Sequence, residues 1–177
     1  SDIRHPEWFR LLGADGTIPF PDAHFDLVAA LMVLEHVADP AAFLGEVARV
    51  LRPGGCFVGH TISGAHYVTW VRRAVGLLPH RVNQLLVRRL YGRECEDTFP
   101  TVYALNTARA VRRAGRAAGL RLTAVRRYAD PGYFRFFGLL QAAAVVTDRA
   151  MEWAGSGLGR LYLTVTLTRD GVVTAAA

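Results

Sequence analysis

Between residues 25 and 62, a strand pattern, a helix pattern and a second strand pattern follow one another, and this succession limits the fold more than any other feature. The run FDLVAALMV, residues 25–33, is continuously apolar and of strand length, which is typical of a central strand in a parallel sheet. A helix begins at Asp39–Pro40 and is expected to end at Gly54–Gly55, and CFVGHTI follows as the next strand. Strand, helix and strand within about 40 residues predict a right-handed crossover in an α/β fold with a doubly wound, mostly parallel sheet.

The rest of the chain predicts further elements around this unit. They are a short strand over residues 9–15, two helices broken at Pro79 over 65–92, a helix over 107–118, a strand LRLTAVRRYA, an aromatic-rich helical insertion over 131–153 and a strand RLYLTVTLTR. We therefore expect a single domain spanning residues 1–177. Its parts are a core sheet segment at 1–63, a helical insertion with the substrate region at 64–106, and a carboxyl-terminal helix and strands with the aromatic insertion at 107–170.

Charge and hydropathy limit the partners. The formal net charge is +6, yet all the basic residues are arginine, which together with abundant alanine indicates GC-rich coding more than selection for phosphate contacts. We interpret the basic tracts RAVRRAGRAAGLR and LLVRRLYGR as solvated helix faces, so nucleic acid is not a favoured partner. The longest apolar runs are shorter than the roughly 18–20 residues of a membrane span. Without a signal-peptide pattern or a disulfide framework, the chain is predicted to be cytoplasmic.

The polar pair Glu35 and His36 ends the apolar strand pattern. Ligands of open parallel sheets bind outside the carboxyl ends of the strands, so we expect these two side chains to face a crevice there. The alternative is that Glu35 bonds to loop backbone and His36 packs on Pro40. The spacing of the residues leaves both alternatives open.

The run from residue 15 to residue 61 resembles class I S-adenosylmethionine (SAM)-dependent methyltransferases of the small-molecule type, known as methyltransferase type 11. The resemblance rests on a series of motifs in order across about 50 residues: Asp15 before the turn PFPD, the strand FDLV, the LEH ending, the helix motif E-x-x-R-V-L and the turn PGG. It implies a Rossmann-like fold, methyl transfer to a small molecule, and SAM as the cofactor.

The resemblance also implies roles for particular residues. Asp15 would accept a hydrogen bond from the adenine amino group, with Gly16 positioning the ring, and Leu31 and Met32 would line the floor beneath the cofactor. Glu35 and His36 would face the methyl group or its acceptor, and His36 would act as a general base on an acceptor hydroxyl. Candidates for contact with a small, hydrophobic acceptor lie in the insertions: Tyr67, Trp70, Arg93, Asp97, Tyr103 and Asn106.

The sequence departs from this family at its start. The Gly-rich loop after the first strand, which holds the methionine and ribose parts of SAM, is not present, so we expect an amino-terminally truncated domain. GSGLG, residues 155–159, follows a helix pattern and precedes a strand, and we interpret it as a turn. The alternative function is a noncatalytic, methyltransferase-like interaction module, whose open sheet edge would pair with a partner or a second copy. A nicotinamide dehydrogenase is a third alternative, but it also needs the missing glycines.

Overall fold

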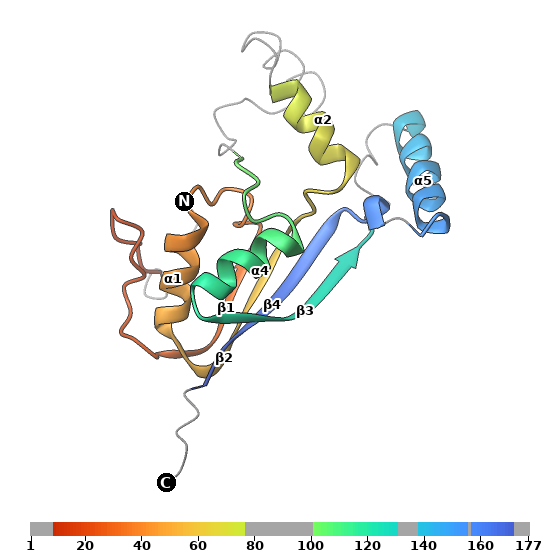
Figure 1. Cartoon of the computed structure of the whole chain (residues 1–177). Coiled ribbons are helices and arrows are strands. Elements are labelled where there is room, and N and C mark those ends of the chain that lie inside the picture. Colours follow the sequence, from red (N-terminus) through yellow and green to blue (C-terminus); the bar gives the residue numbers. More distant parts are fainter. Residues whose placement is uncertain (1–8, 77–100, 131–137, 156, 172–177) are drawn as a thin grey trace.

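The structure of the chain is a computed structural model that describes residues 9–76, 101–130, 138–155 and 157–171 (Figure 1). The described elements follow in this order: β1 (Phe25–Leu31), α1 (Pro40–Val50), β2 (Leu51–Ile62), α2 (Tyr67–Gly76), α4 (Ala108–Ala117), β3 (Leu120–Tyr128), α5 (Gly138–Trp153), the 3-10 helix η3 (Gly157–Gly159) and β4 (Tyr162–Arg169). No described helix is both long and apolar enough to cross a membrane.

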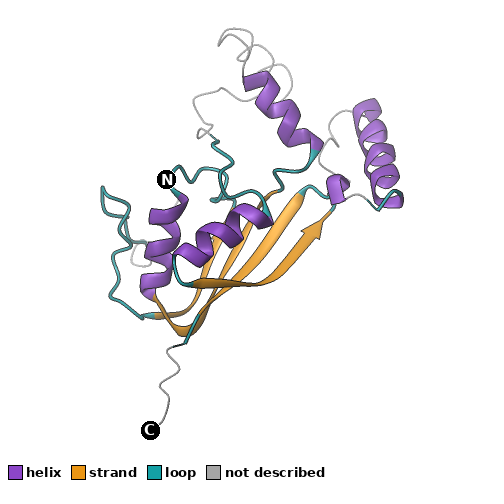
Figure 2. Ribbon diagram, viewed as in Figure 1, coloured by secondary structure: helices purple, strands orange, loops and turns teal. Residues whose placement is uncertain are grey.

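The four described strands form one mixed sheet in the order β1-β2-β4-β3 (Figure 2). Strands β1 and β2 are parallel, as expected for a crossover through α1. Strand β4 is antiparallel to both β2 and β3, so β1, β2 and β3 share one direction and β4 reverses it. The α/β class is confirmed, whereas the mostly parallel sheet is confirmed only in part, because two of the three strand pairings are antiparallel.

Helices α1 and α4 lie beside each other on one face of this sheet (Figure 1). Apolar side chains of both helices meet the sheet in one core, which includes Leu44 and Val47 of α1 and Val111 of α4. Phe57 of β2 and Leu167 of β4 lie beneath them and are completely buried. Asp39 begins α1 by accepting hydrogen bonds from the amides of the helix's first turn, and Thr107 does the same for α4.

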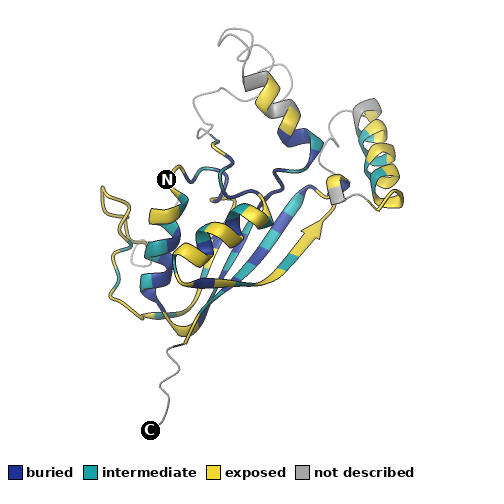
Figure 3. Ribbon diagram, viewed as in Figure 1, coloured by how far each residue is buried: buried dark blue, intermediate teal, exposed yellow. Residues whose placement is uncertain are grey.

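The opposite face of the sheet is open along β1 (Figure 3). Side chains alternate across a strand, and the β1 residues that point away from α1 include Leu27 and Leu31, which are 56% and 68% exposed. The expectation that β1 is a central strand covered on both faces is wrong for the described residues, because β1 lies at an edge of the sheet. The apolar side chains of β1 that point away from α1 are exposed, because no described helix covers that face.

Two further expectations differ from the structure. Residues 9–15 do not form a strand: they are a loop and turn in which Leu11 is 93% exposed, and no described strand pairs with them. Helix α1 ends at Val50 and not at the glycines, because Leu51 takes an extended conformation and pairs with Phe25 as the first residue of β2. The Pro-Gly-Gly turn then lies inside β2 at a shift of register.

Of the other expected elements, some are confirmed and some lie outside the described residues. Helices α2 and α4 and strands β3 and β4 lie where the sequence predicts them. The GSGLG segment contains η3, in keeping with a turn. The helix expected after Pro79 lies outside the described residues, as does the first part of the aromatic insertion, whose described helix is α5.

Candidate active site

Three segments meet at the carboxyl end of the sheet. The chain leaving β1 is tied to the end of β2 by a hydrogen bond from the Met32 amide to the His60 carbonyl, 2.8 Å long. The loop before α4 joins them, because the amides of Val102 and Tyr103 both donate to the Glu35 carbonyl, at 2.7 and 3.0 Å. Residues 31–36, 60–66 and 101–106 therefore form one connected edge, where ligands of open α/β sheets bind.

A buried polar network lies at the centre of this edge. Glu35 is only 3% exposed, and its Oε2 accepts a 2.6 Å hydrogen bond from the Thr61 hydroxyl. The Asn106 side-chain amide donates to that hydroxyl at 2.8 Å and to the Ile62 carbonyl at 2.7 Å. A carbonyl can only accept a hydrogen bond, so the atom of Asn106 that contacts Ile62 must be the side-chain nitrogen. The side-chain oxygen, Oδ1, is then the atom that makes neither of these two contacts.

Two buried polar atoms of this region have no partner among the described residues. Asn106 Oδ1 and the Tyr103 hydroxyl make no hydrogen bond there, although their residues are only 1% and 8% exposed. Tyr103 has a positive φ of 57°, and the Arg73 guanidinium lies 5.3 Å from the centre of its ring. An unmet buried polar group costs about 1–3 kcal/mol, so these two atoms suit a ligand that supplies hydrogen-bonding groups.

The turn after β1 presents apolar side chains to solvent. Leu31 is 68% exposed and Met32 is 40% exposed, so both are accessible as a floor for a ligand. Met32 has a φ of 55°, the left-handed region that non-glycine residues rarely adopt. Such backbone strain persists only where surrounding contacts impose it, and here the Met32 amide is held by β2.

Asp15 and Gly16 lie on a separate loop that is fixed to α1. Asp15 Oδ1 accepts from the Thr17 amide at 3.0 Å, and this hydrogen bond lowers the pKa of the exposed carboxyl below its usual 3.8. Gly16 has a φ of 84°, which suits glycine. The loop continues to Ile18, whose amide donates to Glu46 of α1 at 2.9 Å.

A second polar cluster joins α2 to α5. His66 Nε2 lies 3.6 Å from Asp148 Oδ1, and its Nδ1 accepts from the Val68 amide at 3.2 Å. Burial lowers the pKa of His66 and raises that of Asp148. Tyr67 also bonds to Asp148, and burial raises the pKa of its hydroxyl to about 12. Tyr67 therefore belongs to this cluster and not to the network around Glu35.

Residues 2–59 match the family model described as "Methyltransferase domain", a range that includes β1, α1 and most of β2. A protein of Mycolicibacterium smegmatis named "Probable S-adenosylmethionine-dependent methyltransferase" is 34% identical over 121 residues, which are 64% of this chain and 43% of that protein. Residues 2–59 are therefore similar to the methyltransferase domain, and the chain has SAM-dependent methyltransferase relatives.

Two other proteins show how far this methyltransferase homology extends. A ubiquinone biosynthesis O-methyltransferase of Bradyrhizobium is 43% identical over 65 residues, 30% of this chain and 26% of that enzyme. One solved structure is the complex between the Haloferax volcanii Trm112 methyltransferase activator and a methyltransferase. The match to a chain of this structure covers 90% of the present chain and 61% of the matched chain, at 20% identity and a TM-score of 0.52. This structural likeness shows the shared fold. The chain thus spans less than half the length of these two curated relatives.

The structure brings only some of the predicted site residues together. Glu35, Tyr103 and Asn106 share one network, but Glu35 is enclosed and hydrogen-bonded instead of facing a crevice as expected. His36, whose amide donates to the Val33 carbonyl at 2.9 Å, is next to this network in sequence and partly exposed. Arg93 and Asp97 lie outside the described residues.

Sequence reasoning missed Thr61, His66 and Asp148. The segment HTISGAH carried a signal, since polar residues end an otherwise buried strand at the carboxyl edge of the sheet. Asp148 gave no such signal, because its partner His66 is 82 positions away (148 − 66), in the turn just before α2.

Proposed function

We propose that this domain takes part in methyl transfer from SAM to the hydroxyl of a small, hydrophobic acceptor. The observation that carries the proposal is the match of residues 2–59 to the methyltransferase domain, a range that includes Asp15, Gly16, Leu31, Met32 and the Glu35–His36 pair. The Bradyrhizobium relative, an O-methyltransferase of ubiquinone biosynthesis, supports a hydroxyl acceptor.

The described residues fit the adenine side of SAM. Asp15 has a lowered pKa, so its carboxylate is ionised at neutral pH and suits the donor amino group of adenine. Gly16 turns the backbone beside it without a side chain. Leu31 and Met32 expose apolar surface at the carboxyl edge of the sheet, which suits the apolar parts of the cofactor. SAM itself would supply the electrophilic methyl group.

The chain's contribution to chemistry would be alignment. The leaving thioether is neutral and needs little acid-base help, so the site chiefly holds the reacting groups in line. Glu35 would act as a positioning residue, since its carboxylate and carbonyl tie together the ends of β2 and of the loop before α4. His36 would accept the proton of the acceptor hydroxyl. Asn106 Oδ1, which lacks a donor, would accept a hydrogen bond from the acceptor.

Calorimetric titration with S-adenosylhomocysteine tests the cofactor part of the proposal. We expect a form extended upstream to include a Gly-rich loop to bind with a dissociation constant below about 100 µM, roughly −5.5 kcal/mol, and the 177-residue chain alone not to bind. In the extended form, Asp15→Ala should weaken binding about tenfold, the scale of one charge-assisted hydrogen bond. Asp22→Ala removes another exposed carboxylate of the same loop, which pairs with Arg49, and should leave the affinity unchanged. Absence of binding by both forms would refute the proposal and favour the noncatalytic interaction module.

The role of His36 needs a separate measurement. His36→Gln should lower the rate of methyl transfer to a hydroxyl acceptor by about 10²-fold or more, because general base catalysis contributes this much. The same substitution should not change the affinity for S-adenosylhomocysteine. An unchanged rate would show that positioning alone is sufficient and would remove His36 from the mechanism.

A further inference from the structure

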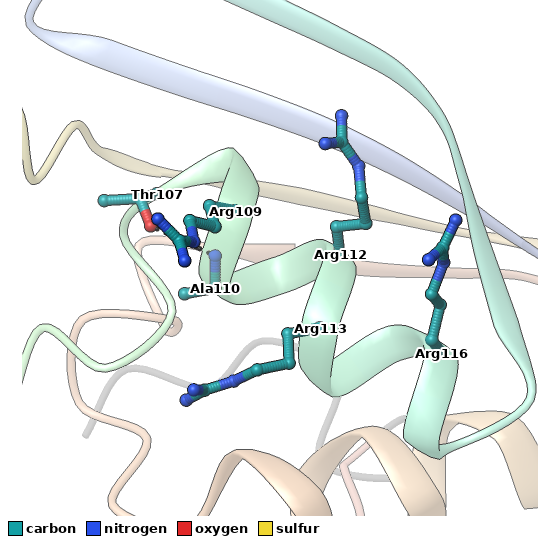
Figure 4. Close-up of a pocket in the computed structure, with 6 residues that line it drawn as sticks. All are labelled: Thr107, Arg109, Ala110, Arg112, Arg113 and Arg116. Atoms are coloured by element: carbon teal, nitrogen blue, oxygen red, sulfur yellow. Dashed lines mark hydrogen bonds between the residues drawn. The ribbon is translucent and has the colours of Figure 1, made fainter.

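The outward face of α4 carries four exposed arginines. Arg109, Arg112, Arg113 and Arg116 follow the spacing i, i+3, i+4 and i+7, which places them on one side of the helix. With Thr107 and Ala110 they line a surface hollow of about 610 Å³ (Figure 4). We call this set of four residues the arginine face.

The arginine face has no anionic partner within the described part of the chain. None of its four side chains takes part in an ion pair or a side-chain hydrogen bond there. Other arginines of the protein do have carboxylate partners: Arg52 with Asp26, Arg121 with Asp170, and Arg160 with Glu152. Residues 98–129 contain seven arginines and no aspartate or glutamate, so a carboxylate partner must come from another segment, as Asp170 does for Arg121.

The helix that presents the arginine face is held firmly. Val111 and Gly115 on its other side are buried against the sheet, and Thr107 caps its first turn with a hydrogen bond to the Ala110 amide. The apolar side of α4 is therefore already used by the core. An amphipathic helix that binds a lipid surface must insert its apolar side, so this packing argues against a membrane as the partner.

The chemistry of the arginine face further limits the classes of ligand that it can bind. Figure 4 shows the guanidinium groups spread along the helix and not turned toward one point, which suits an extended anion better than a single phosphate. Alanine, glycine and threonine lie among the arginines, without the large apolar or aromatic anchors of protein interfaces. Helix α4 also has no aromatic side chain on which unpaired bases could stack.

We propose that the arginine face binds the phosphate backbone of a duplex nucleic acid. Arg109 and Arg116 are seven positions apart, a rise of about 10.5 Å, and one strand of a duplex carries a phosphate about every 3.4 Å along the duplex axis, so the face spans about three phosphates. Such contacts are independent of base sequence. The proposal does not rest on methyl transfer. The absence of carboxylate partners among the described residues and the buried opposite side of α4 argue against a merely solvated helix face.

Fluorescence anisotropy of the 177-residue chain with a labelled duplex of about 20 base pairs, in about 50–200 mM salt, tests the proposal. Replacing Arg109, Arg112 and Arg116 by Gln should weaken binding at least about tenfold and reduce the slope of log K against log salt by about 3. The control replaces Arg52, Arg121 and Arg160 by Gln, which changes the net charge equally but removes only paired arginines. This control should retain the wild-type slope to within about 1.

Three outcomes would overturn the proposal. One is absence of duplex binding at the lowest salt concentration. Another is an equal loss of duplex affinity in both triple variants, which would show that binding depends on net charge and not on the arginine face. The third is equal or tighter binding of a single strand or of a polyglutamate of the same charge, since either would identify a different partner. Thermal melting of both variants verifies that each is folded.

Discussion

Thr61 is the residue on which the buried network of the candidate site depends. The Thr61 hydroxyl donates a hydrogen bond to the Glu35 carboxylate and accepts one from the Asn106 side-chain amide, so both buried groups depend on it. Thr61→Val keeps the shape but leaves the enclosed carboxylate without this donor. We expect a loss of about 2–3 kcal/mol in the free energy of unfolding, measured by urea denaturation. The control is Thr123→Val in β3, whose exposed hydroxyl donates to Thr166 and should contribute less than about 0.5 kcal/mol.

His66 should make stability depend on pH. Burial lowers the pKa of its imidazole below the usual 6.5, so as the pH falls through about 6.5 the unfolded chain takes up a proton that the folded chain resists. The His66 contribution is therefore present above pH 6.5 and is lost at lower pH, by up to about 1.4 kcal/mol per pH unit. Asp148 acts in the opposite direction, because burial raises its pKa and its protonated form is favoured in the folded state.

The measurement is urea unfolding of wild type and His66→Gln between about pH 7.5 and 5.5. The stability advantage of wild type over the variant should shrink as the pH falls. His60→Gln removes a different imidazole, which contacts Thr164 on the open face of the sheet, and serves as the matched control. A difference between wild type and His66→Gln that does not vary with pH would contradict the expectation.

At the scale of the element, α4 packs closely on the sheet because Gly115 lacks a side chain. A methyl group at this position would overlap Leu167 Cδ2 and lie 3.2 Å from the Leu120 carbonyl. Gly115→Ala should therefore shift α4 and destabilise the fold by about 1–3 kcal/mol. Gly45→Ala in α1 is the matched control, since nothing lies within 4 Å of its new methyl group and it should stabilise by up to about 1 kcal/mol. Thermal unfolding of both variants would compare them, and equal effects would contradict this account.

Local patterns predicted the elements better than they predicted the sheet. Helices α1 and α4 follow from caps and apolar spacing, which are encoded within a few residues. The position of β1 at an edge does not follow from its own sequence, because the neighbours of a strand are fixed by contacts distant in the chain. The expected strand at residues 9–15 failed for the same reason: it has no described strand to pair with.

The candidate site shows the same limit. Glu35 and Asn106 were identified separately, from a strand ending and from a polar loop. Both residues hydrogen-bond to Thr61. This shared partner depends on how the loop before α4 folds over the ends of β1 and β2. Tyr67 was assigned to the same site, yet its partner Asp148 comes from α5, a contact that no local pattern could indicate.

At the scale of the whole molecule, the open face beside β1 should promote self-association. Leu27 and Leu31 expose apolar surface next to an edge strand with unpaired backbone groups, the arrangement that most readily recruits another strand. We expect the apparent mass of the chain in light scattering to rise with protein concentration. Leu27→Lys places a charge on this face and should reduce the rise, whereas Leu158→Lys, an exposed site on η3, should not. A constant monomer mass for wild type would contradict the prediction.

Strand β4 is the last described element of the chain but lies inside the sheet, between β2 and β3. A ribosome adds about 5–20 residues per second, so the roughly 100 residues between the end of β2 and the start of β4 take about 5–20 seconds to appear. During that interval β2 has only β1 as a partner, and β3 has none among the described strands. The described sheet therefore closes only after β4 has been synthesised, and until then the nascent chain exposes strand edges that chaperones recognise and that other nascent chains can capture.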